Sequence, residues 1–476
     1  MPLILSGNVA SATAAAYTVA NSCRFNDDDS AYMHKTPSSS GSQRTFTFST
    51  WWKQGDLAST SIIFSSGGGG PNFAIYYDGS QQFNVLYYEG STLLQLITNA
   101  VYRDPSAWYH ICVAIDTTQS TDTNRAKIYI NGSQVTSLAT ETYCNQNVDI
   151  SINTSSYRMA IGAGVSDGDI ADGYAAETVL IDGQQLTPTS FGEFDSASPT
   201  IWKPIDVSGL TFGTNGFYLD FEDSANLGND ANGGTDLTEV NLAAADQATD
   251  TPTNNFCTLN PLWKESTSAG AITYSEGNTT YQATTNGNSY TRGTVGISSG
   301  KWYMEMKVTE VNTGQSSSMT ITPDNNYGAA DSSSSYGFQV QLNSSNTVLN
   351  KFVTGTWTEI NASFSSGSIA MLAIDLDNGK MWVGYDGTWY NDNNASTTFD
   401  TNNPDATGIP TTIGYLVGFQ AYWQTGGYYN TANANFGSPS YTISSANSDA
   451  NGYGNFEYAP PSGYYALCTK NLAEYG

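Results

Sequence analysis

The sequence predicts an all-β protein built from two tandem antiparallel β-sandwiches of the jelly-roll type. Short runs rich in Val, Ile, Phe, Tyr and Trp alternate with stretches of Ser, Thr, Asn and Gly, which is the pattern of strands joined by turns. Aromatic residues make up 13% of the chain and charged residues only 12%, against about 25% in an average soluble domain. The 476 residues exceed what one hydrophobic core usually serves, and no convincing amphipathic helix interrupts the pattern.

The first expected strands lie between residues 45 and 88. They are the segments 45–52, 61–64, 72–77 and 82–88, with the sequences TFTFSTWW, SIIF, NFAIYY and QFNVLYY. Alternation at the start of the first segment places Phe46 and Phe48 on one face, as a half-buried strand requires. The stretch GGGGP at 67–71 can continue no strand and is expected to be a loop.

A unit of strand, turn and strand occurs in each half of the chain. Residues 107–116 (AWYHICVAID) lead through a polar turn into 126–132 (AKIYING). Residues 370–375 (AMLAID) lead through 376–379 (LDNG) into 380–385 (KMWVGY), and Asn-Gly between two strands favours a tight hairpin turn. The two halves therefore share this strand-turn-strand unit without forming a close internal repeat.

Composition divides the chain into four parts. Residues 223–265 contain NLGNDANGGT and AAADQATDTPT, polar tracts punctuated by Gly and Pro that are typical of a connection. We therefore expect an N-terminal segment at 1–20, a first sandwich at 21–222, a linker at 223–265 and a second sandwich at 266–476.

Charge and targeting signals exclude several classes of partner. With 16 basic and 43 acidic residues the net charge is −27, which repels a phosphate backbone, so nucleic acid is not an expected partner. The five cysteines are far apart and form no C-x-x-C pair, so neither a disulfide scaffold nor a zinc site is indicated. The N-terminus lacks the features of a signal peptide, and no later segment predicts membrane insertion. We expect a protein that is made and kept in a cytoplasm.

Motifs of the first half resemble laminin-G-like jelly rolls of the concanavalin A type. Residues 45–53 resemble their F-T-x-S-x-W strand. Trp108, His110 and Asp116, followed by IYING at 128–132, resemble their W-x-H…D…Y-x-N-G core. The resemblance implies a concanavalin-A-like sandwich for the first half.

Motifs of the second half resemble SPRY domains. They are GKWYME at 300–305, DLDNG at 375–379 with Trp382, and NANFG at 433–437. The resemblance implies that a SPRY-like sandwich follows the first one.

The order of further motifs is similar to that in a group of bacteriophage structural proteins of the tail-fibre or minor structural type. These motifs are RFNDDDSAY at 24–32, LIDGQQLTP at 180–188 with FGE at 191–193, NGFYLDF at 215–221 and CTLNP at 257–261. The resemblance implies a structural protein of the virion surface, either a fibre or adhesin or a capsid decoration, that is assembled in the host cytoplasm. It also implies lectin-like modules, other virion proteins as partners, a homo-oligomer, and attachment to the host or to a cell-surface glycan.

Catalysis is the first alternative, because concanavalin-A-type sandwiches also include glycoside hydrolases with an E-x-D-x-x-E strand. Two carboxylates that are two residues apart on a strand face the same way, as acid/base chemistry at a sugar bond requires. The nearest matches are Glu193 with Asp195 and Asp220 with Glu222, but Ser198 and Ala225 stand where the third carboxylate belongs. We therefore expect no catalytic residues and no enzyme, and we keep a polysaccharide-degrading tail enzyme as an alternative. A bacterial surface adhesin is the other alternative, disfavoured by the missing signal peptide.

An acidic run offers a hypothetical metal site. Asp167, Asp169 and Asp172 alternate near a glycine, and such oxygen ligands suit Ca²⁺. The alternative is a solvated turn that binds no cofactor.

Aromatic side chains offer a hypothetical ligand site, since sugar rings stack on Tyr and Trp. The segment 422–429 (YWQTGGYY) places Trp423, Tyr428 and Tyr429 around a Gly-Gly turn with no charge. The alternative is a hairpin whose aromatic rings are buried in the core.

Overall fold

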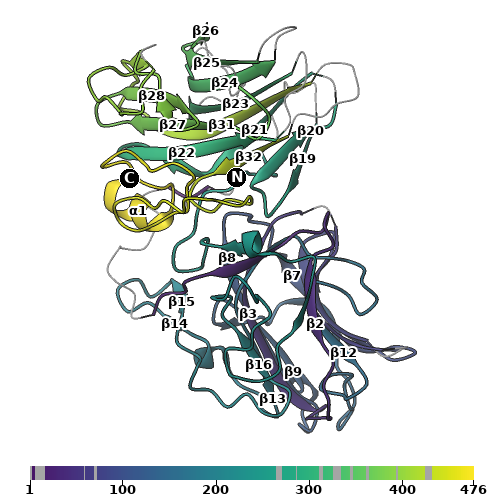
Figure 1. The fold of residues 1–476 in the computed structure, drawn as a ribbon. Helices are drawn as coiled ribbons and strands as arrows, with labels where there is room; N and C mark the ends of the chain where they lie inside the picture. The colour runs from purple at the N-terminus through teal and green to yellow at the C-terminus, as the bar shows by residue number, and fades with distance from the viewer. Residues whose placement is uncertain are drawn as a thin grey trace. The chain divides into compact units, whose positions relative to one another are not determined.

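The computed structural model describes residues 3–5, 17–57, 59–68, 72–263, 271–285, 287–309, 315–324, 334–342, 347–360, 364–392, 395–423 and 431–476. Contacts divide the chain into two compact units (Figure 1). The N-terminal unit comprises residues 14–253, and the C-terminal unit comprises residues 254–476 together with residues 1–13.

The N-terminal unit is a sandwich of two antiparallel sheets. The first sheet has the order β10 (Ser133–Gln134), β9 (Ala126–Ile130), β8 (Trp108–Asp116), β3 (Thr45–Gln54), β13 (Gly173–Asp182), β1 (Ser22–Phe25) and β18 (Gln247–Ala248), with β16 (Phe217–Leu219) beside β13. The second sheet has the order β11 (Leu138–Thr142), β7 (Thr92–Val101), β6 (Gln82–Tyr88), β5 (Asn72–Tyr77), β4 (Ser61–Gly67), β12 (Arg158–Ile161), β2 (Tyr32–Lys35) and β17 (Thr238–Val240). A separate hairpin joins β14 (Gly192–Phe194) to β15 (Trp202–Pro204), and short 3₁₀ turns lie at Asp122–Asn124, Pro188–Ser190 and Ala244–Asp246.

Alternating side chains of these sheets form the core of the N-terminal unit. Phe46 and Phe48 of β3 both lie in this core, as expected, but Thr47 and Ser49 between them are buried too, so β3 is buried on both faces and is not the half-buried strand expected. Phe48 stacks on Phe64 with ring centroids 4.7 Å apart, and Phe46 meets Phe73 edge to face at 5.4 Å. These contacts join the two sheets, since Phe64 and Phe73 belong to β4 and β5 of the second sheet.

Residues 223–253, expected to be part of a linker, instead complete the N-terminal unit. Leu227 and Leu237 enter its core, β17 pairs with β2, and β18 pairs with β1. The polar composition of this tract concealed these contacts, because its few apolar side chains are spaced too irregularly to indicate a strand.

The C-terminal unit is also a sandwich of two antiparallel sheets. One has the order β19 (Ile272–Ser275), β20 (Thr280–Ala283), β32 (Thr431–Asn435), β22 (Lys301–Val308), β27 (Ile369–Asp375), β28 (Lys380–Tyr385) and β29 (Thr388–Trp389), with β30 (Ala406–Thr407) beside β28. The other has the order β21 (Gly287–Ile297), β31 (Tyr415–Trp423), β23 (Ser316–Pro323), β24 (Tyr336–Leu342), β25 (Thr347–Val353) and β26 (Thr356–Glu359). Within the described ranges the one α-helix is α1 (Thr469–Tyr475), so the predicted all-β class of two antiparallel sandwiches is confirmed.

The expected hairpin between β27 and β28 is present. Asp375 accepts hydrogen bonds from the backbone N–H of Asn378 at 3.0 Å and from its side-chain amide at 2.9 Å. Gly379 has a φ of +62°, and a Cβ there would lie 2.4 Å from the carbonyl oxygen of Ile409, so glycine suits this position.

Both ends of the chain pack on the C-terminal unit (Figure 1). Ile4 forms a parallel bridge with Val295, while Trp302 of β22 forms one with Tyr465. Further along the N-terminal segment, the backbone N–H of Val19 donates to Thr253 Oγ1 at 3.1 Å within the N-terminal unit. The expected N-terminal segment is thus built into the fold at its described residues.

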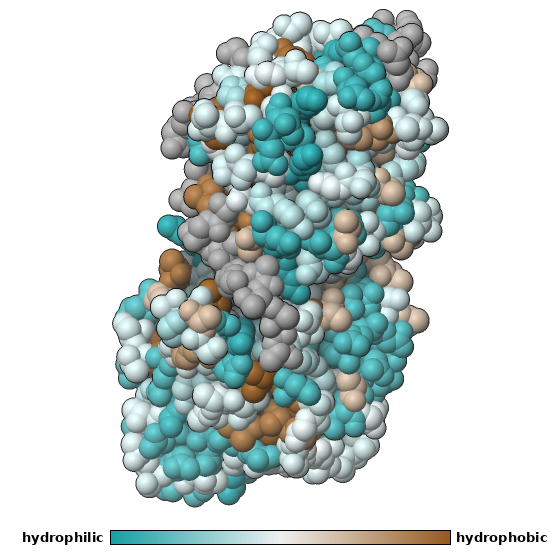
Figure 2. Space-filling view, turned by 90° about the vertical axis from the view of Figure 1, so that its left-hand side faces the viewer, coloured by the Kyte–Doolittle hydropathy of each residue, from teal (hydrophilic) through white to brown (hydrophobic). Residues whose placement is uncertain are grey.

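On the face shown in Figure 2, hydrophobic residues form only small patches among neutral and hydrophilic ones. No helix among the described residues is long and apolar enough to cross a membrane.

Candidate functional site

The expected aromatic recognition loop begins where β31 ends. The backbone of Trp423 pairs with Gly287 of β21. The Trp423 side chain and all of Tyr428 and Tyr429 lie outside what the structure describes. Ligand binding at this loop therefore stays a prediction.

The three aspartates proposed for Ca²⁺ have separate roles in the structure. Asp167 Oδ1 lies 2.6 Å from Arg158 Nη1, and this hydrogen bond holds the pKa of the Asp167 carboxyl below its usual range. Asp172 is buried and accepts a hydrogen bond from the backbone N–H of Asp56 at 3.3 Å. Asp169 accepts one from Ile62 through its carbonyl oxygen. In the described part of the chain no three His, Cys, Asp or Glu side chains gather to hold a metal ion, so the geometry gives the Ca²⁺ hypothesis no support.

Three of the four carboxylates considered for catalysis make local contacts. Glu193 and Asp195 each lie 3.3 Å from the ammonium of Lys203 across the β14–β15 hairpin. Asp220 Oδ1 accepts the backbone N–H of Glu222. These contacts are those of a surface ion pair and a turn.

His110 of β8 is a packed residue. It is completely buried, its Nε2 lies 2.9 Å from Ser49 Oγ, and its Nδ1 accepts from Trp202 Nε1 at 3.0 Å. Burial lowers the pKa of the imidazole to about 3, so it stays neutral at physiological pH.

A groove that the sequence analysis did not identify lies on the outer face of the second sheet of the N-terminal unit. Phe73, Ile75 and Tyr77 of β5 point into the core, so the alternate residues of this strand face outward. Ala74 lies opposite Ser65 on one side and Leu86 on the other. This cross-strand row forms the floor of the groove.

The groove has a volume of about 410 Å³, and a hydrogen-bonded loop forms a wall along one side of it. Its lining consists of Thr60, Ile62, Ser65, Asn72, Phe73, Ala74, Tyr76, Leu86, Gly164, Val165, Ser166, Gly168 and Asp169. The wall is the loop that follows β12, closed by a hydrogen bond from Gly164 N–H to the Gly168 carbonyl at 2.8 Å. Ser65 Oγ donates to the Ala163 carbonyl at 2.7 Å, and Arg158 Nη2 donates to the Gly164 carbonyl at 2.9 Å. These bonds fix the wall in place before any ligand arrives.

The strands beneath the groove carry no charged residue. None of the side chains in β4, β5, β6 or β7 is Asp, Glu, Lys or Arg. Between residues 57 and 102 the only charged residues are Asp78 and Glu89, both in turns. The scarcity of charged residues in this segment is visible in the sequence. Only the strand register shows that the uncharged side chains share one outward face.

Tyr76 is the aromatic side chain that lines the groove at its outward face. Burial raises the pKa of its hydroxyl, and Asp78 and Asp169 add to the shift, so the ring stays neutral. Asp78 itself is held by the turn, where it accepts the backbone N–H groups of Ser80 and Gln82. A neutral ring, amide and hydroxyl groups, and an apolar floor can stack on and hydrogen-bond a sugar, but they offer no acid/base pair.

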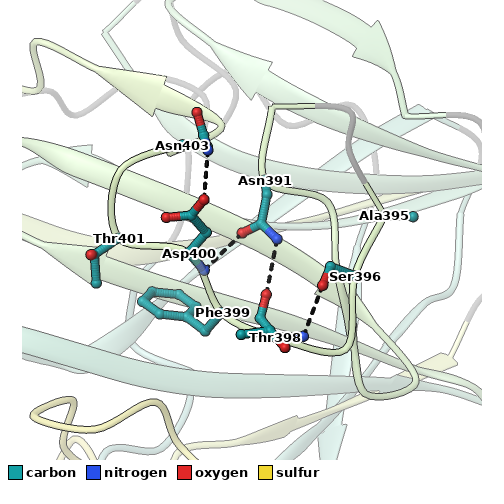
Figure 3. Close-up of a pocket in the computed structure, with 8 residues that line it drawn as sticks. All are labelled: Asn391, Ala395, Ser396, Thr398, Phe399, Asp400, Thr401 and Asn403. Carbon is teal, nitrogen blue, oxygen red and sulfur yellow. Dashed lines mark hydrogen bonds between the residues drawn. The ribbon is translucent and has the colours of Figure 1, made fainter.

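The C-terminal unit holds a second hollow of about 380 Å³, formed by the loop that follows β29 (Figure 3). The Asn391 side chain bridges this loop, donating to the Thr398 carbonyl at 3.0 Å and accepting the Asp400 N–H at 3.1 Å. The Asp400 carboxylate accepts from Asn403 Nδ2 at 2.6 Å, and Phe399 packs on Trp382. Because its central polar groups are used within the loop, this hollow offers a ligand less than the groove does.

Comparison with known proteins agrees with the fold of the N-terminal unit. Residues 27–190 match a family model described as the concanavalin A-like lectin/glucanases superfamily, which agrees with the fold expected for the first module. No curated protein matches the sequence.

Three solved structures are among those with detectable similarity to this chain. A putative carbohydrate binding protein from Bacteroides ovatus ATCC 8483 is 14% identical, with 47% of this chain and 58% of that chain covered and a TM-score of 0.32. Domains LG4-5 of the mouse laminin alpha1 chain are 10% identical, with 86% and 85% covered and a TM-score of 0.29. The TRIM65 PSpry domain is 12% identical, with 38% and 92% covered and a TM-score of 0.26.

Proposed function

We propose that this protein is a non-enzymatic glycan-binding component of a bacteriophage virion surface, and that the groove beside Tyr76 holds the glycan. The observation that carries the glycan part is the groove, with its uncharged strand floor and its hydrogen-bonded wall, on a concanavalin A-like module. The family description names both lectins and glucanases. The pairing of Glu193 and Asp195 with Lys203 favours the lectin side.

The virion part of the proposal has a different support, namely the order of the phage-type motifs between residues 24 and 261. It includes other virion proteins as partners, a homo-oligomer, and a host cell-surface glycan as the ligand. Immunogold labelling of purified particles tests this part. Regular labelling of heads or tails supports it, and absence of the protein from infectious particles contradicts it.

Replacing Tyr76 with alanine is expected to weaken glycan binding about tenfold or more, because the stacking surface of the groove is lost. Tyr76→Phe keeps the ring and should retain most of the affinity. Phe194→Ala is the matched control, since Phe194 is an exposed aromatic residue of the same unit on the separate β14–β15 hairpin. A glycan array identifies a ligand, and titration calorimetry measures its Kd for each variant.

Two results of that experiment contradict the proposal. If the array shows no glycan bound, the function is wrong. If a glycan binds equally well to the Tyr76→Ala protein, the groove is not the site.

The purified protein is expected to release no reducing sugar from any polysaccharide that it binds, because Glu193 and Asp195 pair with Lys203 and Asp220 accepts a backbone N–H group. A reducing-sugar assay on the bound polysaccharide checks this. Activity that disappears in Glu193→Gln would identify a tail enzyme instead.

A further inference from the structure

We propose that the groove extends along the outer face of the second sheet to Tyr88 and Gln95, and that this face selects extended, neutral oligosaccharides over acidic ones. This inference rests on the proposed glycan-binding function and adds the ligand class.

Strand register places two outward tyrosines at the two ends of one continuous surface. Tyr88 of β6 lies opposite Asn72 of β5, and Tyr76 lies four residues further along β5. At a rise of about 3.3 Å per residue, the two tyrosines are about 13 Å apart along the strands, which is longer than one sugar ring. Ala74 and Leu86 form an opposed pair between them. This surface therefore offers stacking positions for two separate sugars of one chain.

Amide side chains along this surface can hydrogen-bond sugar hydroxyls. Asn72 lines the groove, and Gln95 lies opposite Leu86 on the next strand. Both side chains are half-buried, and no hydrogen bond to another described side chain occupies either amide. An amide presents donors and an acceptor at once, which matches the hydroxyl groups of a neutral sugar.

The charged groups at the edges of this surface disfavour an acidic ligand. Asp169 belongs to the wall, Asp78 to the turn after β5, and Glu89 follows Tyr88. The basic side chain that holds the wall, Arg158, is already paired with Asp167. A uronate or sialate carboxyl group would therefore meet like charges with no basic residue of the lining to offset them.

The exposure of Tyr88 is that of a residue at a ligand site and not of a core residue. Tyr88 is 42% exposed, one of the most exposed large hydrophobic residues in the described chain. Since its ring is held by no core packing, Tyr88→Ala should fold like the parent, and its effect on binding can be read directly.

Titration of the full-length protein with two series of oligosaccharides tests the inference. One series is neutral, gluco- and manno-oligosaccharides from disaccharide to hexasaccharide, and the other is oligogalacturonides of the same lengths. We expect affinity to rise with length in the neutral series only. In the parent protein we expect the affinity to rise about tenfold from the disaccharide to the longer neutral chains. Tyr88→Ala should abolish this rise and leave the disaccharide affinity unchanged. Tyr76→Ala should weaken the binding of every neutral ligand.

Each alternative outcome has a distinct meaning. Oligogalacturonides that bind as tightly as neutral chains, with loss in Tyr76→Ala, would overturn the selectivity but keep the proposed function. Neutral binding without a length effect, unchanged in Tyr88→Ala, would overturn the extension to Tyr88. A change in sedimentation, but not in glycan affinity, for Tyr88→Ala would assign the face to self-association. Absence of binding to any glycan on an array would reject the proposed function together with this inference.

Discussion

Replacing Asp250 with alanine is expected to lower the free energy of unfolding of the N-terminal unit by about 3–5 kcal/mol. Asp250 Oδ2 lies 2.6 Å from Lys53 Nζ, and the exposed fractions of the two side chains are 0% and 1%. Asp250 Oδ1 also accepts a hydrogen bond from Trp108 Nε1 at 3.0 Å. Removal of the carboxylate leaves the lysine ammonium buried without this counter-charge, which costs more than the ion pair itself contributes.

Two further variants show whether the loss of stability comes from leaving a buried charge unpaired. The double variant Lys53→Met with Asp250→Leu removes both charges and should be more stable than Asp250→Ala. Asp149→Ala is the surface control, because Asp149 forms an exposed ion pair with Arg44 at 2.6 Å, and it should leave the urea midpoint nearly unchanged. Urea unfolding followed by tryptophan fluorescence measures all three. Equal midpoints for Asp250→Ala and Asp149→Ala would contradict the prediction.

The Lys53–Asp250 pair also shows why the extent of the N-terminal unit could not be predicted from the sequence. Asp250 belongs to a polar tract, and its partner lies 197 residues earlier in the chain. Alternation and turn residues report on neighbours along the chain, so they predicted the β3 strand and the Asn378–Gly379 hairpin. A single long-range ion pair leaves no such pattern.

The groove beside Tyr76 could not be located from the sequence. The sequence favours the loop around Trp423 as an uncharged aromatic surface, because Gly-Gly separates large rings there. The structure shows a comparable surface around Tyr76, built by residues from the three strands β4, β5 and β6 and by the loop after β12. Only the register of β5 against β6 reveals that Tyr76 and Tyr88 share one face.

Replacing Glu305 with alanine is expected to destabilise the C-terminal unit by on the order of 4 kcal/mol or more. The Glu305 carboxylate is buried in β22 and accepts four hydrogen bonds: from Tyr303 Oη at 2.9 Å, Asn435 Nδ2 at 3.1 Å, and the backbone N–H groups of Glu457 and Tyr458 at 3.1 and 2.8 Å. It thereby fixes the segment before Pro460 onto the sheet. Without the carboxylate these donors stay buried and unsatisfied, at about 1–3 kcal/mol each.

Chemical unfolding of the Glu305→Ala protein, compared with Glu359→Ala, measures this effect. Glu359 lies on the exposed edge strand β26, so its loss should change stability little. Equal stability of the two variants would show that the segment is held by other contacts.

The same carboxyl group predicts how stability depends on pH. Burial raises the pKa of Glu305 from 4.5 to about 7, and the four hydrogen bonds only partly oppose this. Because the folded pKa is the higher one, the folded state binds more protons than the unfolded state between these values. The stabilisation is therefore complete below about pH 4.5 and is lost as the pH rises through 7, an effect of about 3 kcal/mol.

Glu305→Gln cannot titrate, so the stability difference between the parent and this variant should shrink from pH 5 to pH 8. A difference that stays constant or grows over that range would mean that Glu305 is ionised throughout in the folded protein, with its hydrogen bonds outweighing its burial.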